Sequence, residues 1–280
     1  MRYSNSNANM SQLPSVCCMR GSMHAGTPTG TEEVVHGLQT YVARPADGAP
    51  VNGTVVICAD AFGWQFINLR LIADSYARRG GFRVLMPDFH FGKPLSTDHL
   101  DLAFPMKGRE QPFWRRVISL VLGLPQFVFW LWVHRQSVSY PIITNWFAAL
   151  RDEQAKVGAK TGVAGFCWGG RYALLVNDYV DAIYTAHPSM LSVPGEIEMI
   201  TKPVSFAVGE KDPVLPLPQV EKIKGVLSKK KDSLNSEVIV YEGMPHSFAV
   251  RGNPEIVEAK KGLEGSETQA VDWFTKHLHA

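Results

Sequence analysis

Residues 162–170 read GVAGFCWGG, and this stretch decides the fold of the chain. Its opening residues, 162–166, form a short apolar run that is typical of a strand buried on both faces. The residues from Trp168 to Asn177 have helical spacing, so Cys167 lies on the turn between a strand and a helix. Turns of the pattern Gly-x-nucleophile-x-Gly expose a reactive side chain above a sheet, and cysteine stands here where serine is usual. The glycines are required because strand and helix approach each other closely at such a turn.

The position of Cys167 at the start of a helix suits a nucleophile. The positive end of the helix dipole favours the charged thiolate. The next backbone N–H, that of Trp168, is placed to donate to the oxyanion that develops when a thiolate attacks a carbonyl. A glycine-rich turn that carries an inert cysteine is the alternative interpretation.

An acid and a histidine follow the cysteine in the order that a catalytic triad on this kind of turn requires. The apolar run at 204–208 is followed by a turn that carries Asp212, and the run at 238–241 by a loop that carries His246. Both side chains leave the carboxyl ends of expected strands, where α/β sheets place their sites. We predict that His246 takes the thiol proton and later activates water, while Asp212 holds the imidazole tautomer. Taken singly, each could be an ordinary loop residue.

The rest of the chain alternates between apolar runs and segments with helical spacing. This alternation predicts an α/β fold with a mostly parallel central sheet and helices on both faces. We expect strands at residues 34–43, 53–58, 82–86, 162–166, 182–186, 204–208 and 238–241, and helices at 66–80, 142–157, 168–177, 218–231, 254–261 and 267–278. About 50 residues separate the strand ending near 88 from the next helix, where loops usually have only a few. We therefore predict a tail at 1–30 and one domain at 31–280, with an insertion at about 93–140.

The insertion contains an apolar, aromatic-rich run from Ile118 to Val133. A membrane-spanning helix needs about 20 apolar residues, so this run is short, and Pro125 interrupts it. A hydrophobic lid over the site is the interpretation that we favour. A helix making weak contact with a membrane surface, flanked by Arg116 and Arg135, and a true membrane span are the alternatives.

Three motifs together resemble the dienelactone hydrolase family of α/β-hydrolases: the cysteine turn, GEKDP at 209–213 and PHSF at 245–248. The resemblance extends upstream to ADAFG at 59–63 and VLMPD at 84–88, and covers roughly residues 30–92 and 140–278. It implies the α/β-hydrolase fold and a carboxylic ester hydrolase whose triad is Cys167, His246 and Asp212.

The resemblance also implies roles for the loop at 59–63. Family members hold the resting cysteine near an acid, and Asp60 occupies that position, although the family uses the longer glutamate. The N–H of Ala61 matches the second oxyanion donor of the family, beside that of Trp168.

Two arginines bind the substrate carboxylate in the family, and neither is found at its expected position in this sequence. They would fall on Gly92 and Val250, and here Lys93 and Arg251 stand one residue later. A bidentate grip depends on the fixed fork of arginine, so dienelactone itself is a poor candidate substrate. The candidate substrate-binding residues are Phe62, Lys93, His187, Phe248 and Arg251.

The insertion points to the same conclusion about the substrate. Aromatic side chains in a lid would line a roomy apolar pocket, which predicts a less polar ester, lactone or thioester. These side chains are Phe113, Trp114, Phe127, Phe129, Trp130 and Trp132. The alternative is that they merely cover the sheet.

Composition excludes several classes of protein. Hydrophobic residues make up 45% of the chain, which excludes extended disorder, and a net charge of +2 does not support nucleic-acid binding. The four cysteines in 280 residues do not form the closely spaced disulfide framework of a small secreted protein, so we expect the protein to be cytoplasmic. The sequence shows no metal cluster and no phosphate-binding loop, so we expect no cofactor and a small-molecule substrate; the oligomeric state stays open.

Two other functions are compatible with the same residues. One is a non-hydrolytic cyclase, isomerase or lyase of a fungal biosynthetic pathway, because a lid that excludes water would favour such chemistry and a fold does not fix a function. The other is a ligand carrier or membrane-peripheral scaffold, against which the complete Cys-His-Asp set argues.

Overall fold

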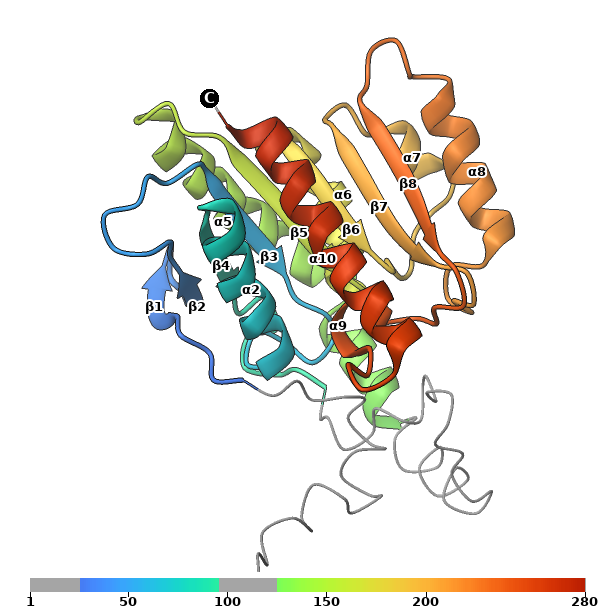
Figure 1. Cartoon of the computed structure of the whole chain (residues 1–280), viewed down its shortest axis with the longest axis horizontal. Helices are drawn as coiled ribbons and strands as arrows, with labels where there is room; N and C mark the ends of the chain where they lie inside the picture. The colour runs from blue at the N-terminus through green and yellow to red at the C-terminus, as the bar shows by residue number, and fades with distance from the viewer. Residues whose placement is uncertain (1–25, 96–124, 280) are drawn as a thin grey trace, which may run out of the picture.

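A computed structural model describes residues 26–95 and 125–279 of the chain. In these residues the core is an eight-stranded sheet with the strand order β1-β2-β4-β3-β5-β6-β7-β8. Figure 1 shows this sheet between two layers of helices. The strands are β1 (Thr31–Val35), β2 (Leu38–Ala43), β3 (Thr54–Cys58), β4 (Arg83–Pro87), β5 (Thr161–Phe166), β6 (Ala182–Ala186), β7 (Val204–Gly209) and β8 (Ser236–Tyr241).

The sheet is parallel except at one edge. Strands β4, β3, β5, β6, β7 and β8 run in the same direction, whereas β2 pairs antiparallel with both β1 and β4. Every residue of β3, β5, β6 and β7 is buried, as expected for strands covered on both faces. The α/β fold with a mostly parallel sheet, which the alternating pattern predicted, is therefore confirmed, and it agrees with the α/β-hydrolase fold that the resemblance implies.

Two hydrophobic cores lie on opposite faces of the sheet. One is built with residues of α2 and α10, and the other with residues of α5, α6 and α8. Figure 1 shows α2 and α10 side by side across the near face. The helices are α2 (Ile67–Gly80), α5 (Gln136–Ala155), α6 (Trp168–Leu175), α7 (Gly195–Glu198), α8 (Leu217–Ser228), α9 (Phe248–Arg251) and α10 (Val257–Leu278), with a 3-10 turn at Asn177–Tyr179.

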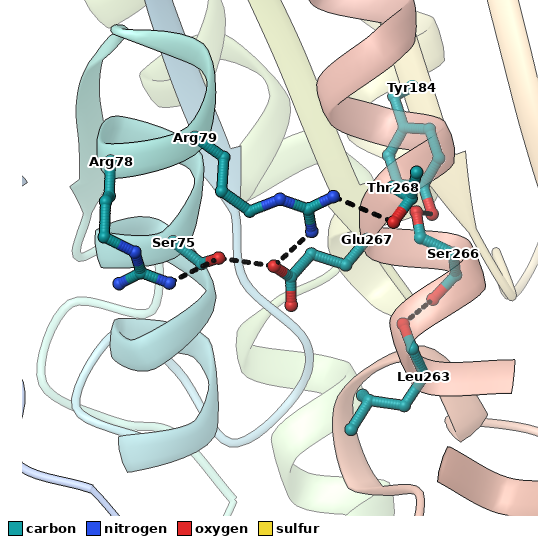
Figure 2. Close-up of polar contacts among 8 residues, drawn as sticks. All are labelled: Ser75, Arg78, Arg79, Tyr184, Leu263, Ser266, Glu267 and Thr268. Carbon is teal, nitrogen blue, oxygen red and sulfur yellow. Dashed lines mark hydrogen bonds and ion pairs between the residues drawn. The ribbon is translucent and has the colours of Figure 1, made fainter. Parts of the chain in front are cut away.

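Polar contacts tie α2 to α10 on the side away from the sheet (Figure 2). The guanidinium of Arg79 donates to Glu267 Oε1 and to Thr268 Oγ1, both at 2.8 Å. The hydroxyl of Ser75 donates to the same Glu267 carboxylate and accepts from Arg78 Nη2 at 3.2 Å. These contacts fix the two helices that cover this face.

Four of the expected elements were wrong in extent. The single strand expected at 34–43 is a hairpin, because His36 and Gly37 take positive φ angles of 47° and 83° and turn the chain. Helix α5 begins at Gln136, ahead of the expected start at residue 142, and continues through Pro141.

The third correction concerns the C-terminal helix. The two helical segments expected at 254–261 and 267–278 are one helix, α10. Its interior glycines are not breaks. A Cβ on Gly262 would lie 2.5 Å from Met244 Sδ, and one on Gly265 would lie 2.9 Å from Tyr241 Cε1. The glycines therefore let α10 pack closely against the segment that carries the candidate histidine.

Most of the predicted insertion, including residues 96–124, lies outside the described residues, as do residues 1–25 of the predicted tail. Residues 125–133 form a helix whose faces differ in exposure. The side chain of Trp130 is 4% exposed, whereas Phe129 and Trp132 are 62% and 61% exposed. The lid therefore stays a prediction. Within the described residues, none of the helices has the length and apolar character needed to cross a membrane.

Candidate active site

The turn between β5 and α6 has the strained backbone of a nucleophile elbow. Cys167 takes φ 51° and ψ −113°, a conformation that non-glycine residues rarely adopt. The flanking glycines are required by contact with backbone. A Cβ on Gly169 would lie 2.1 Å from Cys58 O, and one on Gly165 would lie 2.5 Å from Gly169 O. The sequence folds this way because only glycine lets the end of β3 and the start of α6 approach so closely.

The three residues predicted as a triad lie together at the carboxyl ends of β5, β7 and β8. His246 Nε2 is 3.2 Å from Cys167 Sγ, and His246 Nδ1 is 2.8 Å from Asp212 Oδ2. Asp212 and His246 are 2% and 3% exposed, so solvent hardly competes for these hydrogen bonds. Because a carboxylate accepts, Nδ1 carries a proton and Nε2 faces the sulfur.

Asp212 is held by the turn that carries it. Its Oδ1 accepts N–H groups from Val214 at 2.8 Å and Leu215 at 3.2 Å, which leaves Oδ2 for the imidazole. These two hydrogen bonds fix the orientation of the carboxylate. The turn after β7 therefore orients the acid, and the acid orients the histidine.

The electrostatics of the pair favour an imidazolium. Burial alone would lower the pKa of His246. The negative charge of Cys167 and the hydrogen bond and charge of Asp212 outweigh burial and raise this pKa to about 9. At neutral pH the imidazole that faces the Cys167 sulfur is therefore held in its protonated form.

The loop after β3 lies against the elbow, as an oxyanion-binding loop must. The carbonyl oxygens of Cys58 and Ala59 are within 2.5 Å of the position that a Cβ on Gly169 would occupy. Ala61 follows them in this loop, and its carbonyl accepts an N–H from Leu95 at 2.8 Å. Trp168 begins α6, directly after the nucleophile. Both predicted oxyanion donors thus come from segments adjoining Cys167.

Asp60 is buried in this loop but does not contact the sulfur. Its Oδ1 accepts the N–H of Phe62 at 3.0 Å, and within the described residues its Oδ2 has no hydrogen-bond partner. Burial raises the pKa of Asp60 to about 6, against the opposing effect of the Arg251 charge. Cys167 Sγ is instead within hydrogen-bond distance of His246 Nε2 and Ser189 Oγ.

Four of the five predicted substrate-binding residues form contacts next to His246, either with its ring, with its neighbour Ser247 or with one another. The guanidinium of Arg251 lies 5.1 Å from the Phe62 ring and donates to Ser247 Oγ, so an offset of one residue in register does not keep it away from the site. The ring of His187 lies 5.1 Å from that of His246 and 6.0 Å from that of Phe248. Burial lowers the pKa of His187, so this ring is neutral.

The fifth predicted residue, Lys93, has an exposed side chain. It follows the loop after β4, where its N–H donates to His90 O at 2.9 Å. The structure therefore places Lys93 at the surface of this loop, whereas the side chains of the other four residues are at least half-buried.

Sequence reasoning missed two residues near the nucleophile. Ser189, on the loop after β6, contacts Cys167 through both its backbone and its hydroxyl. The ring nitrogens of His134 contact Trp130 O at 2.9 Å and His90 O at 3.1 Å, which joins the helix at 125–133 to the loop after β4. Neither belongs to a recognisable motif, and only the position of Ser189 at the end of a strand could have drawn attention to it.

The described residues contain no group of three or more His, Cys, Asp or Glu side chains arranged to hold a metal ion. The histidines at the site are instead in contact with aromatic rings. His90, for example, lies 4.6 Å from the Trp168 ring, and burial lowers its pKa to about 3.

Comparisons with known proteins agree with this arrangement. Residues 38–278 match the model of the dienelactone hydrolase family. The hydrolase tropI of Talaromyces stipitatus is 30% identical over 96% of this chain and 99% of its own length. The hydrolase pyvD of Aspergillus violaceofuscus is 28% identical over 95% and 97%. "Dienlactone hydrolase 1" of Gibberella moniliformis is 28% identical over 84% and 83%.

Solved structures show the same fold at lower sequence identity. A dienelactone hydrolase from Anabaena variabilis aligns with a TM-score of 0.53 at 16% identity, covering 91% of this chain and all of that one. Carboxyl esterase 2 of Tuber melanosporum aligns with a TM-score of 0.56 at 12% identity, covering 92% and 90%. The chain is therefore a carboxylic ester hydrolase of lactone or ester type, and it belongs to the dienelactone hydrolase family.

Proposed function

We propose that the protein is a cysteine hydrolase that cleaves an ester, lactone or thioester of a fairly apolar small molecule through Cys167, His246 and Asp212. The observation that carries this proposal is the continuous chain of contacts from Sγ to imidazole to carboxylate, at 3.2 and 2.8 Å. These distances are within hydrogen-bond reach, which is the geometric requirement for a nucleophile and its base.

Acylation begins with the thiolate. The sulfur of Cys167 attacks the substrate carbonyl carbon, and the carbonyl electron pair moves onto oxygen, where the N–H groups of Ala61 and Trp168 donate to it. The oxyanion then collapses and the C–O bond of the ester breaks, or the C–S bond of a thioester. The imidazolium of His246 gives its Nε2 proton to the departing alkoxide or thiolate, which leaves a thioester on Cys167.

Deacylation reverses the roles. Neutral His246 takes a proton from water, and the hydroxide adds to the thioester carbon. The second oxyanion collapses, the C–S bond breaks, and the electron pair returns to sulfur. The products are the free acid, the thiolate and the imidazolium, so the resting pair is restored. Asp212 keeps Nδ1 protonated throughout and stabilises the imidazolium.

An apolar acyl or alcohol portion is proposed from the side chains around the triad. Phe62 and Phe248 supply aromatic surface beside the reacting pair, and Trp130 packs 5.9 Å from Trp168 at the elbow. We assign to Arg251, whose guanidinium stacks on Phe62, a hydrogen bond donated to a carbonyl or hydroxyl oxygen of the same substrate.

The test is turnover of p-nitrophenyl esters of short and medium chain length by wild type and Cys167→Ala. We expect the wild type to release p-nitrophenol and the variant to lose that activity by at least about 10³-fold, because its nucleophile is absent. An equally active Cys167→Ala would refute the assignment. Turnover of lactones in oxygen-18-labelled water then separates hydrolysis from the non-hydrolytic alternative, since only hydrolysis places solvent oxygen in the product.

Two further proposals concern where the protein works. A thiol nucleophile stays reduced in the cytoplasm, which is the compartment that we propose.

Phe129 and Trp132 present exposed aromatic rings with Arg135 stacked 4.9 Å from the Trp132 ring, a combination that suits weak membrane-surface contact. Sedimentation with anionic vesicles checks this, and a Trp132→Ser variant that sediments as well as wild type would contradict it.

A further inference from the structure

Ser189 makes two contacts with the nucleophile. Its backbone N–H donates to Cys167 O at 3.0 Å, and its hydroxyl oxygen lies 3.7 Å from Cys167 Sγ. The residue is 8% exposed, and within the described residues the sulfur is the only side-chain hydrogen-bond partner of its hydroxyl. We propose that Ser189 is a further catalytic residue, whose hydroxyl donates a hydrogen bond to the Cys167 thiolate. This inference rests on the proposed function.

The loop that carries Ser189 is built to hold it there. His187 and Met190, on either side, take positive φ angles of 39° and 57°, which non-glycine residues adopt only where the surroundings enforce them. The N–H of His187 is anchored to Ala207 O on β7 at 2.8 Å.

The elbow makes room for this loop. A Cβ on Gly170 would lie 2.9 Å from Pro188 Cβ and 3.0 Å from Pro188 Cα, so the missing side chain admits the loop beside α6. Together with the backbone bond from Ser189 to Cys167 O, this contact sets the distance between the hydroxyl and the sulfur. The backbone of β7, of the turn at Cys167 and of α6 therefore positions the Ser189 hydroxyl.

The chemistry of the thiolate explains why a second donor is useful. In the neutral site the thiol has one proton, and the direction of the Ser189 contact is from sulfur to hydroxyl. Once His246 holds that proton, the sulfur is an anion with several acceptor positions, and the imidazolium supplies only one donor. The Ser189 hydroxyl rotates and supplies another.

The same donor acts when the thioester breaks. As the C–S bond cleaves, the electron pair returns to sulfur, after His246 has taken the proton of water. A hydrogen bond from Ser189 stabilises the developing thiolate at that moment and makes it a better leaving group. Ser189 thus contributes to acylation through thiolate formation and to deacylation through thiolate departure.

The experiment measures the pH dependence of alkylation at Cys167 by iodoacetamide, in wild type and Ser189→Ala. Trypsin releases residues 161–171 as one peptide in which Cys167 is the only cysteine, so mass spectrometry follows this site in the full chain. The ionisable groups around the reacting pair, all kept in the variant, are His246, Asp212, His187, Asp60 and Arg251.

We expect the acid limb of the alkylation profile to move to higher pH by about one pH unit in Ser189→Ala, which is about a tenfold slower reaction on that limb. Ser192→Ala is the matched control, because Ser192 lies on the same loop with an exposed side chain and should leave the profile unchanged. Acid limbs that superimpose in wild type and Ser189→Ala would overturn the proposal, since a packing role alone would not move them.

A second pair of variants keeps the test decisive if Ser189→Ala folds poorly. Ser189→Thr and Ser189→Val have the same shape, and only the first retains a hydroxyl. We expect the acid limb of the threonine variant to lie at lower pH than that of the valine variant, and coincident limbs would overturn the proposal. The outcome is independent of hydrolysis: an active Cys167→Ala would refute the proposed function, whereas alkylation still reports on the Ser189–Cys167 contact.

Discussion

Adding one methyl group at Gly169 should damage both stability and activity. A Cβ there would lie 2.1 Å from Cys58 O, 2.5 Å from Cys58 C and 2.5 Å from Ala59 O, all of them backbone atoms. Ordinary contact requires about 3.5 Å, so α6 and the end of β3 must separate by roughly 1 Å. Overpacking of this kind costs about 1–3 kcal/mol and more where backbone must move, so we expect Gly169→Ala to lose about 3 kcal/mol.

The same displacement carries the candidate oxyanion loop away from the nucleophile. A misplacement of about 1 Å in a catalytic constellation costs about 10²-fold in rate, and loss of one oxyanion donor costs about 10²- to 10³-fold. We therefore expect kcat for a p-nitrophenyl ester to fall at least about 10²-fold. For a domain of this size, about 3 kcal/mol lowers Tm by about 6–12 °C in a calorimetric or circular-dichroism melt.

Gly225→Ala is the matched control, because it is the same substitution in helix α8, where the added Cβ would meet nothing within 4 Å. Alanine is a better helix former than glycine by up to about 1 kcal/mol, so this variant should melt at or above the wild-type temperature and keep its kcat. A Gly169→Ala protein that matches wild type in both Tm and kcat would refute the steric argument for the elbow.

Four further outcomes are expected. Asp212→Asn should reduce kcat by about 10³- to 10⁴-fold, because the imidazole loses the acceptor that fixes its tautomer, and near-wild-type Tm would show that the loss is chemical. The pKa of His246 is raised from 6.5 to about 9. Its contribution to the free energy of unfolding is therefore fully present below pH 6.5 and is lost as the pH rises through 9. Urea unfolding measured as a function of pH checks this, and a free energy of unfolding that stays constant from about pH 7 to 10 would count against it. Because the pKa of Asp60 is raised to about 6, its ionised form destabilises the fold above about pH 6. Asp60→Asn should therefore raise the free energy of unfolding at neutral pH by up to about 3 kcal/mol. A variant that unfolds more easily than wild type would contradict this. Trp130→Ala should cost about 3–5 kcal/mol because Trp130 is buried, whereas Trp132→Ala, at 61% exposure, should leave Tm within about 1 °C; equal effects would show that the helix at 125–133 packs differently.

The elbow and the parallel sheet were predictable from sequence because their causes are local. An apolar run followed by glycines and a helical segment leaves few alternatives to a strand, a tight turn and a helix. The order of the cysteine, the acid and the histidine then suggests that they meet at one edge of the sheet. These inferences needed only residue type, spacing and chain order.

The extent of other elements depends on contacts that the sequence does not display. Gly262 and Gly265 resemble helix breaks, yet they are small because Met244 and Tyr241 pack against them. His36 and Gly37 form a turn inside a segment whose alternation suggested one strand. In each case packing with a distant segment, or a two-residue change in φ, outweighed the local pattern.

The environment of the sulfur was the least predictable part of the site. Ser189 stands 22 positions after Cys167 and reaches it only because β6 lies beside β5. Arg251, displaced by one residue from the family position, still stacks on Phe62, since a short helix redirects it. Side-chain contacts between loops depend on strand order and backbone direction together, and a single sequence does not specify both.

The central claim, that Cys167 is the nucleophile, is tested most directly by trapping the covalent intermediate. Wild-type protein is quenched in acid during turnover of a p-nitrophenyl ester, and the intact mass and the peptide 161–171 are measured. The proposed mechanism predicts a mass increase equal to the acyl group, located on Cys167 and chased to zero as substrate is exhausted. Rapid turnover with the acyl group found on another residue would contradict it.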